Sequence, residues 1–118
     1  MEYIELISMN DLSSFITRQS EGSIKKELGL YSIPYPVSTL QFRDFEAGHY
    51  FDWHPAPQAQ FIFYLEGQVE ITASDGTRKT FKAGDILFAN DTQGKGHITN
   101  TLTKGRAIIV VIDPTQTQ

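Results

Sequence analysis

From residue 37 to residue 113 the chain consists of short runs of β-favouring residues that are separated by turn signals. In the first run, "VSTLQFRDF", the apolar residues Leu40 and Phe42 alternate with polar neighbours. Alternation with a period of two is typical of a strand that has one buried face. Many short strands with closely spaced turns predict an all-β fold, either a sandwich or a barrel.

The later runs continue this pattern. Turns are expected at Glu66–Gly67 and at Asp75–Gly76, and the second pair suits a two-residue hairpin turn with positive φ. Residues 90–96, "NDTQGKG", are expected to form a loop. The expected strands are "QFIFYL" (60–65), "QVEITA" (68–73), "RKTFKAGD" (78–85), "ILFA" (86–89), "HITNTL" (97–102) and "RAIIVVID" (106–113).

The first third of the chain has a different pattern of predicted secondary structure. Residues 3–7, "YIELI", favour a short strand, and residues 10–19, "NDLSSFITRQ", predict a helix that begins at Asn10 or Asp11. Two prolines, Pro34 and Pro36, follow a mixed stretch, so residues 20–36 are expected to form a turn and a loop. We therefore expect a strand, helix and loop segment at 1–36 that packs on a barrel of residues 37–113, followed by a tail at 114–118.

Composition limits the classes of function. The 118 residues allow one ordinary core and are too few for two. The longest apolar run, from Ala107 to Ile112, is far shorter than a membrane helix requires, and the N-terminus lacks a signal pattern. The chain has no cysteine, which excludes thiolate nucleophiles and sulfur-ligated metals and fits a cytoplasmic protein. With a net charge of -4 and scattered lysines and arginines, nucleic acid is not an expected partner.

A series of polar residues predicts a ligand site in the segment around Pro55 and Pro57. Residues of equal parity share one face of an extended strand, and the shared face here carries His54, Ala56, Gln58, Gln60, Ile62 and Tyr64. A polar mouth above an apolar floor is typical of a ligand pocket. The alternative is a structural His54 that bonds a backbone group, beside glutamines on a solvated strand face.

The loop at 90–96 adds further candidates. Gly94 and Gly96 flank Lys95, which would let the backbone approach a ligand and would offer a cation to an anionic group. The alternative is a flexible polar turn. The complete set of pocket candidates is His54, Gln58, Gln60, Tyr64, Asp91, Lys95 and His97.

The spacing of Gly48, His54, Ala56, Gln60 and Gly67 resembles the first motif of the small single-domain cupins, a family of jelly-roll barrels. That motif runs Gly, five residues, His, one residue, His, three or four residues, Glu, six residues, Gly. The frame is kept here, but alanine replaces the second His and glutamine replaces the Glu.

The second cupin motif is matched less well. Gly84 aligns with its first glycine, whereas Asn90 and Thr92 replace Pro and Gly, and His97 comes two residues later than the pattern asks. The segments "DWHPAPQAQF" and "NDTQGKGH" are similar to a subset of small cupins without an assigned function. The resemblance implies a small jelly-roll β-barrel and a homodimer, in which strand 3–7 could add to the partner's sheet.

The resemblance also raises the question of whether the barrel binds a metal ion. Its implied ligands in this chain are His54, Gln60 and His97, and these supply no negative charge, unlike the family's three His and one Glu. Asp52 or Asp91 could restore a carboxylate. A divalent transition metal therefore stays an open alternative.

Two functional hypotheses follow. In the first, the barrel mouth binds a small polar organic ligand without turnover, which rests on the missing metal ligands. In the second, the protein is an enzyme, either a metal-dependent oxygenase or isomerase or a metal-free isomerase or lyase with a histidine base. The catalytic residues of such an enzyme are not identified by the sequence.

Overall fold

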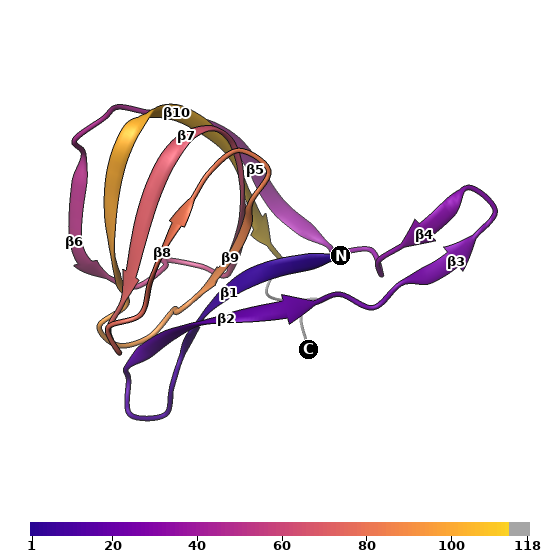
Figure 1. Ribbon diagram of the computed structural model, residues 1–118. Coiled ribbons are helices and arrows are strands. Elements are labelled where there is room, and N and C mark those ends of the chain that lie inside the picture. Colours follow the sequence, from indigo (N-terminus) through magenta and orange to yellow (C-terminus); the bar gives the residue numbers. More distant parts are fainter. Residues whose placement is uncertain (114–118) are drawn as a thin grey trace.

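The computed structural model describes residues 1–113, and the tail expected at 114–118 lies outside the described residues. The prediction of an all-β barrel of jelly-roll type is confirmed, because every regular element is a strand (Figure 1). No helix within residues 1–113 could cross a membrane. The strands are β1 (Glu2–Ser8), β2 (Ser14–Ser20), β3 (Ile24–Lys26), β4 (Gly29–Tyr31), β5 (Val37–Phe45), β6 (Tyr50–His54), β7 (Gln60–Ala73), β8 (Arg78–Phe81), β9 (Ile86–Asn90) and β10 (His97–Ile112).

Eight of these strands form one mixed sheet that curves around a common interior (Figure 1). The strand order is β2-β1-β9-β7-β10-β5, with β6 pairing β10 and β8 pairing β7. The pairs are antiparallel except that β1 runs parallel to β9. Strand β10 is central, since its first half pairs with β6 and β7 and its second half with β5 and β7.

The core lies inside this curved sheet. The inward side chains are apolar and come from strands that are distant in sequence, so burial of their surface stabilises the closed barrel. The buried cluster consists of Leu6, Phe45, Ala56, Tyr64, Val69, Ile71, Ala73, Phe81, Leu87, Ala89 and Ala107.

The helix predicted at 10–19 is wrong. Residues 10–12 form a turn in which Leu12 has a φ of 69°, and residues 14–20 form β2, antiparallel to β1. Phe15 pairs with Ile7 and Ile16 pairs with Leu6, so aromatic and β-branched residues face a second strand. Pairing between strands has overridden the local helical spacing.

The expected N-terminal segment also differs in two other ways. The strand predicted at 3–7 is present as β1, but β1 and β2 belong to the barrel sheet itself and are not a layer packed on it. Because β1 pairs with two strands of its own chain, it is not free to add to a partner's sheet. The loop expected at 20–36 contains the hairpin β3–β4, which extends away from the barrel (Figure 1).

Two predicted breaks are absent in the barrel. A single strand, β7, runs through the turn expected at Glu66–Gly67, and β10 joins the two strands expected at 97–102 and 106–113. Gly67 has a φ of 82°, and a Cβ there would lie 2.8 Å from the Cα of Gly105 on β10. The glycines therefore let two long strands bend together, with register shifts between residues 101 and 107 of β10. The Asp75–Gly76 turn between β7 and β8 is confirmed.

Candidate functional site

The barrel encloses a cavity of about 90 Å³. Its apolar wall includes Phe45 of β5, Ile62 of β7, Leu87 of β9 and Ile109 of β10. Seven polar side chains also line it, namely Arg43, His54, Gln60, Tyr64, His97, Thr99 and Thr101. An apolar cavity with a few convergent polar groups is the usual form of a small-molecule site.

His54 is the last residue of β6 and lies beside His97, the first residue of β10, in the register of the two strands. The His54 Nδ1 atom is 2.7 Å from the backbone oxygen of Asp52. A carbonyl oxygen only accepts hydrogen bonds, so Nδ1 carries the proton and donates it. The neutral His54 ring therefore leaves a lone pair on Nε2.

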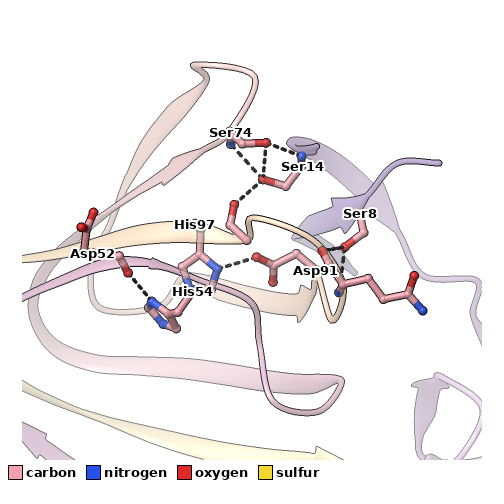
Figure 2. Close-up of polar contacts among 9 residues, drawn as sticks. Ser8, Ser14, Asp52, His54, Ser74, Asp91 and His97 are labelled. Carbon is pink, nitrogen blue, oxygen red and sulfur yellow. Dashed lines mark hydrogen bonds and ion pairs between the residues drawn. The ribbon is translucent and has the colours of Figure 1, made fainter. Parts of the chain in front are cut away.

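His97 is held in the same way by a charged group. Its Nδ1 atom is 2.5 Å from Oδ2 of Asp91, and both side chains are buried (Figure 2). The Asp91 carboxylate accepts the Nδ1 proton, which again leaves Nε2 as the basic nitrogen. The two imidazole ring centroids are 4.6 Å apart. Neither Nε2 atom has a hydrogen-bond partner within residues 1–113.

Hydrogen bonds fix the loop that carries Asp91. The Ser14 hydroxyl donates to the backbone oxygen of Gly96 at 2.6 Å, and Ser14 and Ser74 exchange bonds between β2 and the β7–β8 turn (Figure 2). The hydroxyl of Ser8, on β1, donates to the oxygen of Gln93 at 2.9 Å. The first two strands therefore hold the loop that orients His97.

Tyr64 lies on β7 with its ring stacked on Phe81 at 5.2 Å between centroids. Burial raises the pKa of Tyr64 well above its usual value of 10.0, and the nearby positive charge of Arg43 lowers it by less. The phenol is therefore neutral at working pH. Its hydroxyl has no hydrogen-bond partner within residues 1–113 and is available as a donor at the cavity.

Arg43 is a cavity residue that the sequence analysis missed. It is a solvent-exposed residue of β5, and its guanidinium carbon is 5.6 Å from the centroid of the Phe51 ring. Arg43 makes no ion pair with any residue in the described part of the chain. The alternation in "QFRDF" was the available signal, because it places Arg43 on the same face as Phe45.

The predicted candidates occupy different places. His54, Gln60, Tyr64 and His97 line the cavity, whereas Asp91 lies behind His97 and does not. Gln58 is exposed outside it, because residues 55–59 are not strand and the expected continuous face is interrupted there.

Lys95 is exposed as well. Its ammonium nitrogen lies 4.2 Å from the centroid of the Trp53 ring, a cation–π contact on the outside of the barrel. The expected approach of Lys95 to a ligand is therefore not supported by its position. Gly96, its neighbour in the expected loop, packs against the backbone of His54 instead.

The side chains do not fit the transition-metal site that the resemblance implies. No group of three or more His, Cys, Asp or Glu side chains in residues 1–113 could hold an ion. Asp91 contacts His97 through Oδ2 and does not line the cavity, and its buried Oδ1 has no partner in residues 1–113. Asp52 is exposed and contributes only its backbone oxygen. His54, Gln60 and His97 remain, and these neutral donors give no charge to balance a divalent ion.

Comparison of the sequence with models of protein families identifies one matching family. A model described as "Cupin domain" matches residues 41–113. Among solved structures, a conserved protein of unknown function from Streptococcus pyogenes has a TM-score of 0.49 and 18% identity, covering 64% of this chain and 75% of that one. A protein from Neisseria meningitidis has a TM-score of 0.49 and 15% identity, covering 78% and 82%. No curated protein matches the sequence.

Proposed function

The chain belongs to the cupin domain family, and from this premise we propose that it binds a small polar organic ligand inside its barrel. One observation carries the proposal. Two imidazoles with hydrogen-bonded Nδ1 atoms line a partly apolar cavity, and neither Nε2 atom has a partner within residues 1–113. Within residues 1–113 the only buried side-chain polar atom without a partner is Oδ1 of Asp91, so both Nε2 atoms are accessible from the cavity. A ligand that bonds to these nitrogens would replace the water that they meet there.

The cavity volume limits the ligand to a compact molecule. At 10–15 Å³ per water position, 90 Å³ has room for about six to nine waters. A ligand with a similar number of non-hydrogen atoms would fill the space and contact both the apolar wall and the polar side chains. Fragments of this size bind with millimolar to micromolar dissociation constants.

A ligand screen tests the proposal directly. We expect compact polar compounds to shift amide resonances of cavity residues in two-dimensional NMR spectra of the labelled protein. His54→Ala should weaken such binding, whereas His49→Ala should not, because His49 is exposed outside the cavity. A screen without any cavity binder, or equal binding by both variants, would contradict the proposal.

The contact between Asp91 and His97 favours a second candidate function, that of a metal-free enzyme with a histidine base. A buried carboxylate on Nδ1 orients the imidazole as a general base, with Nε2 as the nitrogen that accepts a proton from a substrate. An isomerase or lyase that removes a proton next to a carbonyl group would use this arrangement.

Deuterium exchange separates this candidate from simple binding. An enzyme of this kind would exchange a carbon-bound proton of its bound ligand with deuterated solvent. Asp91→Asn should slow the exchange with less effect on the dissociation constant, because the base loses its orienting carboxylate. Ligand binding without deuterium exchange would refute the enzyme candidate and support simple binding.

A further inference from the structure

The charges around the cavity point to the class of ligand, an inference that rests on the proposed function. Arg43 is the only charged residue among its lining residues, apart from any charge on the two histidines. No carboxylate in residues 1–113 lines the cavity or pairs with Arg43. A ligand carboxylate would therefore meet a solvent-exposed cation beside which no protein carboxylate competes.

The remaining polar groups require a second feature of the ligand. With each Nδ1 proton donated to an oxygen, the Nε2 atoms of an uncharged imidazole pair accept hydrogen bonds, while the Tyr64 hydroxyl can donate one. A carboxylate alone cannot donate to the imidazoles, whereas a hydroxyl group can. We propose that the cavity binds a short hydroxycarboxylate, with its carboxylate toward Arg43 and its hydroxyl toward His54 and His97.

Four related probes test both parts of this assignment. Lactate has the carboxylate and the hydroxyl, propionate lacks the hydroxyl, lactamide lacks the charge, and propionamide lacks both. We expect lactate to bind most tightly and lactamide roughly tenfold more weakly, as judged from NMR titrations. Arg43→Gln should remove the difference between lactate and lactamide, and Arg43→Lys should restore part of it.

The matched control is Arg106→Gln. Arg106 is an exposed arginine near Asp44 and Glu66, and it does not line the cavity, so lactate binding should not change. Equal affinity for lactate and lactamide would overturn the inference and leave the proposed function intact. If neutral compounds bind the cavity and all carboxylates fail, the ligand class is wrong; if nothing binds, the proposed function fails too.

Discussion

The close approach of Gly96 to His54 gives a prediction whose size can be worked out from the structure. Gly96 has a φ of 75°, and a Cβ built on it would lie 2.0 Å from the backbone oxygen of His54 and 2.4 Å from the nitrogen of Pro55. These are backbone atoms, so they cannot rotate away as a side chain could. Gly76 has a φ of 94° with no atom within 4 Å of the corresponding Cβ, which makes it a matched control.

Two contributions distinguish Gly96→Ala from Gly76→Ala. Both substitutions force alanine into the left-handed region, at a cost of about 1–2 kcal/mol. At Gly96 the overlap must also push β6 from the loop, which costs about 1–3 kcal/mol as overpacking and about 1 kcal/mol if the bond from Ser14 is lost. We expect Gly96→Ala to be the more destabilising change by about 2–4 kcal/mol.

Urea unfolding followed by circular dichroism measures this difference. Total stabilities of about 5–15 kcal/mol are usual, so the midpoint of Gly96→Ala should fall clearly below that of Gly76→Ala, with similar m values. Equal midpoints would mean that the backbones of Gly96 and His54 do not touch. The same displacement should also broaden the NMR signals of the His54 and His97 rings, and an unchanged spectrum would argue against their coupling to Gly96.

Three further predictions concern the site and the core. Because burial raises the pKa of Tyr64 above 10.0, the unfolded chain should lose its phenol proton before the folded protein does, so the free energy of unfolding should fall above about pH 10. Tyr64→Phe should make this fall with pH less steep in urea unfolding experiments. An equally steep fall in the variant would contradict the burial argument. Elemental analysis should find no transition metal in the protein, whereas the double variant Ala56→His with Gln60→Glu should bind one ion per chain. Near-stoichiometric metal in the parent protein would refute the inference that His54, Gln60 and His97 are insufficient ligands. Leu6→Ala should cost about 2–5 kcal/mol in urea unfolding, because Leu6 is fully buried, and Leu102→Ala on the partly exposed surface should cost less; equal losses would show that β1 is not part of the core.

Much of the barrel was predictable because its strands repeat a local pattern. The alternation around Leu40 and Phe42 and the Asp75–Gly76 turn are properties of neighbouring residues, and the structure has a strand and a turn at these places. The buried face expected from Leu40 and Phe42 is wrong, because both side chains are exposed. The helix expected at 10–19 failed because its apolar spacing also suits a strand, and only the pairing of Ile16 with Leu6 decides between them. The bend at Gly67 likewise depends on a glycine of another strand.

The site was predictable only in part for the same reason. His54 and Tyr64 follow from parity, and both line the cavity. The interruption at 55–59 removes Gln58 from this face, which parity counting could not detect. The alternation in β5 could have placed Arg43 on the face of Phe45, whereas the contact of His97 with Asp91 depends on how a loop folds onto a strand, for which a single sequence carries no direct signal.

The central place of β10 has a consequence for how the protein is made. Synthesis runs from the N-terminus, and the last 16-residue strand is the one that joins β5, β6 and β7. At typical rates of about 5–20 residues per second, the completed β7 would wait roughly two to eight seconds for the whole of this partner. During that interval the apolar faces of β5 and β7 are uncovered on the nascent chain, so aggregation or chaperone binding should be most pronounced at this stage.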